Sequence, residues 1–154
     1  MNCTNSLVEQ FDPTIEGIHQ KLIQLDENSS LRLDILDTAG MEEFSVMWPQ
    51  QIRESEGYML VFACDGQRTV TDIQVFLDLI SEEVKKPLVD VPIVLAGNRC
   101  DLDQYYNFDM QEVQQMADMI GAPLIFTSAR QNININKAFE ELAKVVLTKR
   151  QLET

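Results

Sequence analysis

Four short polar segments hold the side chains of this sequence that could do chemistry. They lie at residues 11–16 (Phe-Asp-Pro-Thr-Ile-Glu), 37–40 (Asp-Thr-Ala-Gly), 98–101 (Asn-Arg-Cys-Asp) and 127–130 (Thr-Ser-Ala-Arg). Their carboxylate, amide and hydroxyl groups can donate or accept hydrogen bonds to a polar ligand. The same residue types also close ordinary turns, and each segment taken singly is more often a turn than a site. The placement of the segments in the fold therefore decides between the two interpretations.

The strands that must position these segments are predicted from apolar patterns. They are expected at residues 18–25, 31–36, 58–63, 92–96 and 123–126. The first two are expected to form a hairpin around the polar cluster at 26–30. The last three are near-continuous apolar runs, which are typical of strands covered on both faces in a parallel sheet.

Helices are predicted between these strands. Apolar residues recur at i, i+3 and i+4 spacing within 70–80, 110–120 and 138–146. Pro49 is expected to start or kink a further helix. The alternation of strands and helices predicts an α/β fold, in which ligands bind beyond the carboxyl ends of the strands. Three of the polar segments directly follow a predicted strand, and this favours a site.

The composition restricts the classes of function. The chain has 154 residues, of which 45% are apolar and 24% charged, and this suits one folded domain over residues 1–154. A net charge of −13 argues against nucleic acid or an anionic membrane as primary partner, because both favour a basic face. No apolar run approaches the ~20 residues of a membrane span. Three cysteines without metal-ligand spacing indicate reduced thiols and a cytoplasmic location.

In this order and placement, the four segments resemble the motifs of Ras-family small GTPases. The run at 33–40 (Leu-Asp-Ile-Leu-Asp-Thr-Ala-Gly), continued by Glu42-Glu43-Phe44, carries the strongest likeness, which extends from about Leu7 to the last helix. The resemblance implies a P-loop-NTPase-type three-layer sandwich with a mostly parallel sheet and one antiparallel edge strand. It also implies a GTP/GDP-dependent signalling switch.

The resemblance assigns one set of residues to the guanine base. They are Asn98, Arg99, Asp101, Ser128, Ala129 and Arg130. Asp101 would accept two hydrogen bonds from the base, and a base lacking those donors would leave its carboxylate unpaired. Asn98 would tie the recognition loops together, and the Ala129 N–H would donate to the guanine carbonyl.

A second set is assigned to the phosphates, the metal ion and protein partners. Thr14 and Asp37 would hold Mg²⁺ with GTP or GDP, and the Gly40 N–H would donate to the γ-phosphate. Effector and regulator proteins would bind through a switch segment formed by Asp12, Pro13, Thr14, Ile15 and Glu16.

The phosphate-binding loop of the family, Gly-x-x-x-x-Gly-Lys-Ser/Thr, does not occur among these residues. None of the six glycines has a glycine five positions later. Losing even four charge-assisted bonds of ~1.5 kcal/mol each removes ~6 kcal/mol, or about four decades of affinity. We therefore expect weak or absent nucleotide binding, and a G domain that is incomplete at its N-terminus and lacks its first central strand. Its absence would leave the strands at 31–36 and 58–63 ~9–10 Å apart, so either they pair directly or the domain is marginally stable.

Other departures affect catalysis and partners. Met41 stands where the family has the glutamine that orients the attacking water, so any hydrolysis should be very slow, and whether the chain is an enzyme stays open. Leu7 replaces an aromatic residue at the base, and Gly17 replaces an acidic effector contact. The last residues, Gln-Leu-Glu-Thr, offer no cysteine for a lipid anchor, so membrane association is expected only if a longer form carries a lipidated tail.

Three hypotheses follow for the function. The first is a shortened Ras-like GTPase whose nucleotide binding and hydrolysis are impaired. The second is a pseudo-GTPase, a protein-interaction module that binds no nucleotide, and it is favoured by Met41, Leu7 and Gly17. The third is a product that does not fold stably, which a broad, non-cooperative melt would indicate.

Overall fold

The computed structural model describes residues 16–38, 46, 48–63, 69–98 and 110–153. Its elements, in chain order, are β1 (Glu16–Gln24), β2 (Ser30–Thr38), α2 (Trp48–Glu54), β3 (Tyr58–Ala63), α3 (Thr69–Val84), the 3-10 helix η2 (Leu88–Asp90), β4 (Ile93–Asn98), α4 (Met110–Ile120), β5 (Leu124–Phe126) and α5 (Ile135–Glu153). The predicted α/β class is confirmed. Among the described residues, no helix is both long and apolar enough to cross a membrane.

The first two strands form the predicted antiparallel hairpin. They pair in register from Glu16 opposite Thr38 to Gln24 opposite Ser30. The turn is closed by hydrogen bonds from the Leu25 N–H to the Ser29 carbonyl (3.0 Å) and from the Asn28 N–H to Asp26 Oδ1 (2.8 Å). Hydrogen bonds from the Ser29 side chain and the Asn28 backbone lower the pKa of Asp26.

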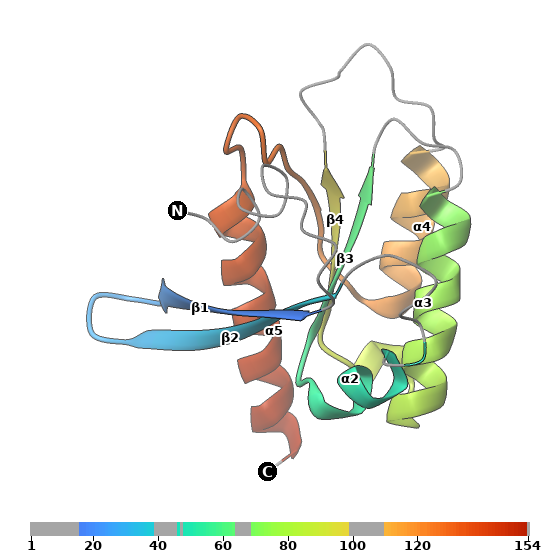
Figure 1. The fold of residues 1–154 in the computed structure, drawn as a ribbon, viewed down its shortest axis with the longest axis horizontal. Coiled ribbons are helices and arrows are strands. Elements are labelled where there is room, and N and C mark those ends of the chain that lie inside the picture. The colour runs from blue at the N-terminus through green and yellow to red at the C-terminus, as the bar shows by residue number, and fades with distance from the viewer. Residues whose placement is uncertain (1–15, 39–45, 47, 64–68, 99–109, 154) are drawn as a thin grey trace.

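The three apolar runs form a parallel sheet in the order β3-β4-β5. The central strand β4 is buried along almost its whole length, as its apolar sequence predicts. Figure 1 shows α3 and α4 on one side of this sheet and α5 on the other. Side chains of β3, β4, α3 and α4 form the larger core, in which Leu77, Ile80, Ile93, Leu95 and Val113 are almost completely buried.

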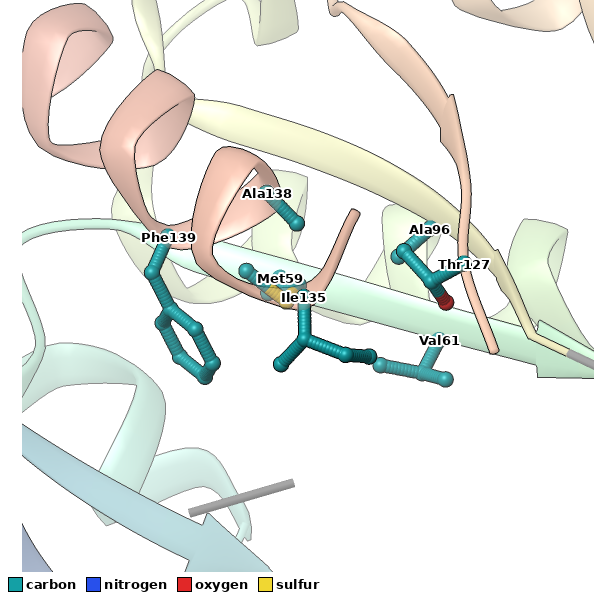
Figure 2. A pocket seen from close by; sticks show the side chains of 7 residues that line it. All are labelled: Met59, Val61, Ala96, Thr127, Ile135, Ala138 and Phe139. Atoms are coloured by element: carbon teal, nitrogen blue, oxygen red, sulfur yellow. The ribbon is translucent and has the colours of Figure 1, made fainter. Parts of the chain in front are cut away.

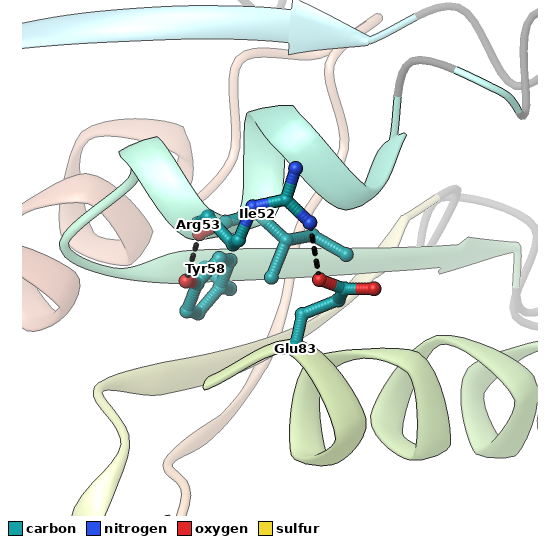
Figure 3. A network of polar contacts seen from close by, with 4 residues as sticks. All are labelled: Ile52, Arg53, Tyr58 and Glu83. Carbon is teal, nitrogen blue, oxygen red and sulfur yellow. Dashed lines mark hydrogen bonds and ion pairs between the residues drawn. The ribbon is translucent and has the colours of Figure 1, made fainter. Parts of the chain in front are cut away.

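Helix α2 starts next to Pro49, as predicted, with the proline as its second residue. Proline is tolerated there because the first N–H groups of a helix have no partner within the helix. The Tyr58 hydroxyl donates to the Ile52 carbonyl (2.5 Å), and Arg53 pairs with Glu83 of α3 (2.5 Å; Figure 3). These two contacts fasten α2 to the start of β3 and to the end of α3.

The hairpin and the parallel sheet are separate sheets, so β2 and β3 do not pair directly. Figure 1 shows the hairpin running across the direction of β3 and β4. The hairpin is held by α5 instead, because Ile23 packs in a small core with Ile135, Phe139 and Ala143. The Lys21 ammonium also lies 5.8 Å from the centre of the Phe139 ring. Of the two outcomes considered for these strands, direct pairing is therefore excluded.

Candidate functional site

Asn98 is the last residue of β4, and its side chain is bonded to the segment after β5 at the carboxyl end of the parallel sheet. Its Oδ1 accepts a hydrogen bond from the Ala129 N–H (3.2 Å) and lies 3.5 Å from the Thr127 hydroxyl. The Thr127 N–H donates to the Gly97 carbonyl (2.7 Å), which extends the pairing of β4 and β5 by one step. The half-buried Asn98 amide is therefore fixed against the segment that follows β5.

The segment after β5 is a compact loop with its own hydrogen bonds. Ser128 and Ile133 form an isolated antiparallel bridge, with N···O distances of 3.0 and 2.9 Å. The Ser128 hydroxyl accepts from the Gln131 N–H (3.1 Å), and this serine is fully buried. Arg130, at the tip of the loop, is exposed. The bridge restricts the backbone at residues 128–133, so the polar groups of this loop are held in a fixed arrangement beside Asn98.

Two asparagines lie where this loop leads into α5. Asn132 and Asn134 have φ values of 55° and 56°, a left-handed conformation that asparagine tolerates better than most residues. The Asn134 amide donates to the Phe126 carbonyl (2.9 Å), and the Asn134 carbonyl accepts from the Ala138 N–H (3.0 Å) of the first turn of α5. Sequence reasoning missed these two residues, although the alternation Asn-Ile-Asn-Ile-Asn at 132–136 was a readable signal.

Gly97 is a second residue that sequence reasoning missed. A Cβ atom at this position would lie 2.7 Å from the Phe126 ring and 2.8 Å from the Phe62 ring. Only glycine lets the backbone of β4 pass between these rings and deliver Asn98 to the edge of the sheet. A glycine inside a strand pattern signals such a close approach.

The structure brings together three of the residues predicted for the base: Asn98, Ser128 and Ala129. Of Asp37 and Glu16 it describes the backbone only, with Glu16 opposite Thr38 and Gly17 opposite Asp37 in the hairpin. The other predicted site residues lie outside the described residues; they are Asp12, Pro13, Thr14, Ile15, Gly40, Met41, Arg99 and Asp101.

Asn98 and the backbone of the loop after β5 offer neutral groups that can form hydrogen bonds. Asn98 contributes a side-chain amide, and the loop contributes backbone groups in a fixed arrangement, which suits the edge of a planar polar molecule. Within the described ranges, no three His, Cys, Asp or Glu side chains gather to hold a metal ion. An apolar hollow between β3 and α5 carries no charged group, so it does not suit a phosphate.

The family comparison identifies the chain. A model of the Ras family matches residues 2–148, which is nearly the whole sequence. The chain belongs to the Ras family. It is therefore a small GTPase by family, and the α/β fold with its parallel sheet agrees with a P-loop-type Ras fold. Ras-family proteins in general bind Mg²⁺ with GTP or GDP and act through effector and regulator proteins.

In this Ras-family chain the predicted base-recognition motif spans both described and undescribed residues. Asn98 and the loop after β5 have the geometry given above, whereas Asp101 follows Asn98 by three positions outside the described part. The described residues of the motif meet at the end of β4, where the Asn98 amide is bonded to the segment after β5.

Proposed function

We propose that this chain is a Ras-like small GTPase domain that binds guanine nucleotide weakly and acts as a GTP/GDP-dependent signalling switch in the cytoplasm. The observation that supports this best is the hydrogen bond between the Ala129 N–H and Asn98 Oδ1, which ties the end of β4 to the segment after β5 at the carboxyl end of the sheet. A loop that merely closed a turn would not need an asparagine amide from the neighbouring strand to hold it.

In this proposal Asp101 supplies the specificity. Its carboxylate accepts hydrogen bonds from the guanine N1–H and exocyclic amine, and Asn98 and Ser128 hold the neighbouring loop in place. The Ala129 N–H would have to share its bond to Asn98 with the guanine carbonyl, or exchange one for the other. Arg99 would lay its stem along the base, and the exposed Arg130 would border it.

The phosphate end of the proposed site has few groups that suit a polyphosphate. These 154 residues contain no Gly-x-x-x-x-Gly-Lys motif, and the net charge of −13 opposes a polyphosphate. Thr14, Asp37 and Gly40 are the residues that we propose for Mg²⁺ and the γ-phosphate. With Met41 at the water-orienting position, we expect little or no hydrolysis even where nucleotide binds.

The first test is the nucleotide content of the purified protein. The chain would be purified with Mg²⁺ and denatured, and released GDP and GTP would be quantified by ion-exchange chromatography. We expect far less than one nucleotide per chain, because affinity is reduced. Near-stoichiometric nucleotide would contradict impaired binding, and would mean that other groups replace the phosphate loop.

The second test is base selectivity, measured by calorimetric titration at high protein concentration with GDP, IDP and ADP. IDP lacks the exocyclic amine, so it should bind about tenfold or more weakly than GDP, the value of one bond to a charged acceptor. Asp101→Asn should abolish this difference. Asn98→Ala should weaken the binding of GDP. Asn28→Ala, the same change in the exposed hairpin turn, should leave GDP binding unchanged. Equal binding of GDP and ADP would exclude a guanine site.

The second candidate function is a pseudo-GTPase, an interaction module that binds no nucleotide. The independent departures at Met41, Leu7 and Gly17 favour it, since each weakens a different part of the usual activity. It predicts an empty protein that nevertheless melts cooperatively. A broad, non-cooperative melt of the empty protein would instead indicate a chain that does not fold stably.

A further inference from the structure

One side chain closes the loop after β5 at its base. Asn134 Nδ2 donates to the carbonyl of Phe126, the last residue of β5 (2.9 Å). Figure 2 shows the two ends of the loop around one apolar hollow, which is lined by Thr127 after β5 and by Ile135 at the start of α5. The Asn134 carbonyl also accepts from the Ala138 N–H in the first turn of α5 (3.0 Å). Asn134 therefore bonds both to the strand before the loop and to the helix after it.

The Ala129 N–H, which we propose for the guanine carbonyl, lies inside this closed segment. The bridge between Ser128 and Ile133 is nested within the bond between Phe126 and Asn134. Ala129 is 5% exposed and packs in the small core between the hairpin and α5. The bonds that close the loop on either side of Ala129 therefore determine where its N–H points.

We propose that Asn134 is a positioning residue for base recognition, which acts through the Phe126 carbonyl on the direction of the Ala129 N–H. This role rests on the proposed function and deepens it at the same site. The backbone enters α5 at Asn134 with a φ of 56°, a conformation that favours glycine or asparagine. Glycine would allow this conformation but has no side chain that could donate to Phe126. Asparagine supplies both, so the loop is ordered before a ligand binds and the ordering cost of binding is lower.

A purely structural role for the same bond has a different consequence. It would lower the stability of the fold and weaken the binding of every guanine nucleotide by the same factor. A positioning role weakens each nucleotide in proportion to its use of the Ala129 N–H. GDP and 6-thio-GDP distinguish the two roles, because they differ in the one atom that would accept from this N–H, and sulfur is a weak acceptor. The ratio of the two affinities therefore reports how well the N–H is directed.

The test compares Asn134→Gly with Asn132→Gly in the whole chain. Both asparagines are exposed and lie in the same loop, with φ values of 56° and 55°, so both substitutions change the backbone in the same way. Calorimetric titration at high protein concentration, with Mg²⁺, would measure the Kd of GDP and of 6-thio-GDP. Wild type should bind GDP about threefold to tenfold more tightly than 6-thio-GDP. Asn134→Gly should weaken GDP by a similar factor and bring the ratio close to one, whereas Asn132→Gly should keep the wild-type values.

The outcomes distinguish a failure of this role from a failure of the proposed function. Equal effects of the two substitutions would overturn the positioning role and leave the proposed function intact. Equal losses of GDP and 6-thio-GDP in Asn134→Gly would do the same, because they indicate a structural role. A wild-type chain that binds neither nucleotide would contradict the proposed function, and with it any role of Asn134 in base recognition.

A second variant and a measurement without nucleotide cover the case in which Asn134→Gly disturbs folding. Asn134→Asp keeps the size of the side chain and tolerates the left-handed backbone, but its carboxylate cannot donate to Phe126. It should lower the affinity ratio as Asn134→Gly does, and a wild-type ratio would overturn the proposal. In both variants, hydrogen exchange at the Ala129 amide should become about threefold faster or more, while exchange at the Leu95 amide, which donates to the Pro123 carbonyl, stays unchanged. Unchanged exchange at Ala129, or equal acceleration at Leu95, would overturn the proposal.

Discussion

Gly97, which has no side chain, helps to determine where the amide of the neighbouring Asn98 lies. The Phe62 and Phe126 rings meet edge to face, with centroids 6.4 Å apart and planes at 83°. The backbone of β4 passes close to both rings at Gly97 and ends one residue later at Asn98. Packing in the apolar core thus fixes the amide that is bonded to the loop after β5, so core stability and site geometry are coupled at this position.

The substitution Gly97→Ala should destabilise the protein by about 1–3 kcal/mol, the usual range for overpacking a core. Its Cβ would lie within 3 Å of both rings, so the rings or the backbone would have to shift. Urea denaturation measures the loss. Adding Phe126→Leu should recover part of the stability of Gly97→Ala, while Phe126→Leu alone should be destabilising. Additive losses in the double variant would refute the steric explanation.

Tyr58 gives a prediction about pH. Burial raises the pKa of its hydroxyl above 10.0, and the hydroxyl donates to the Ile52 carbonyl. Because the folded pKa is the higher one, the stabilisation is complete below the unfolded pKa and is lost as pH rises through the folded pKa. Wild type should lose stability as pH rises above about 10. Tyr58→Phe should cost about 1 kcal/mol at pH 7 and lose less than wild type over that alkaline range. Parallel pH curves for both proteins would contradict the assignment.

Alternation of buried and exposed side chains along β1 determines how the hairpin packs on α5. Neighbouring residues of β1 differ greatly, since Ile23 is 3% exposed and Leu22 is 69% exposed. Ile23 reaches α5, whereas Leu22 points to the opposite face of the hairpin. The hairpin is therefore attached to the rest of the molecule through one of its faces.

The matched pair Ile23→Ala and Leu22→Ala tests this attachment. Ile23→Ala should destabilise the protein by about 2–4 kcal/mol, because it opens a cavity against Phe139 and Ala143. Leu22→Ala should stay within about 0.5 kcal/mol of wild type. Thermal and urea denaturation would both measure the difference. Similar losses for the two variants would show that the hairpin is not fixed on α5 in this register.

The sequence predicted those elements whose signal is local. The strand at 58–63 and the helix at 110–120 have the predicted bounds, because apolar runs and i, i+3, i+4 spacing depend on near neighbours only. The resemblance to the Ras family implied that Asn98 ties the recognition loops together, and the structure shows its bond to the Ala129 N–H. The separation of β2 from β3 was left undecided, because strand pairing depends on contacts distant in sequence. Gly97 was overlooked because its role appears only when Phe62 and Phe126 are placed beside it.

At the scale of the whole molecule, the net charge of −13 dominates the long-range electrostatics. Ion pairs among the described residues include exposed ones, for example Arg32 with Asp34 and Arg150 with Glu56. Exposed pairs of this kind contribute about 0–1 kcal/mol each. The 25 acidic side chains outnumber the 12 basic ones, so the excess carboxylates repel one another in the folded state.

Salt should stabilise this protein. Raising NaCl from 10 to 200 mM should shorten the screening length from about 30 to below 10 Å and reduce the repulsion. A gain of ~1 kcal/mol would raise the melting temperature by roughly 2–4 °C for a domain of this size. Differential scanning calorimetry over a salt series measures the shift, with an equal osmolarity of glycerol as control. A melting temperature that falls with salt would mean that the ion pairs outweigh the repulsion.

The dependence of the hairpin on α5 also has a consequence for synthesis on the ribosome. The hairpin is complete at Thr38, but its packing partners Ile135, Phe139 and Ala143 are translated about a hundred residues later. At roughly 5–20 residues per second, the apolar face around Ile23 waits for at least about 5–20 s before it can be covered. During this interval the apolar face of the hairpin in the nascent chain is exposed to solvent. Ribosome-associated chaperones that shield such surfaces should therefore matter more for the yield of this protein than for its stability once it has folded.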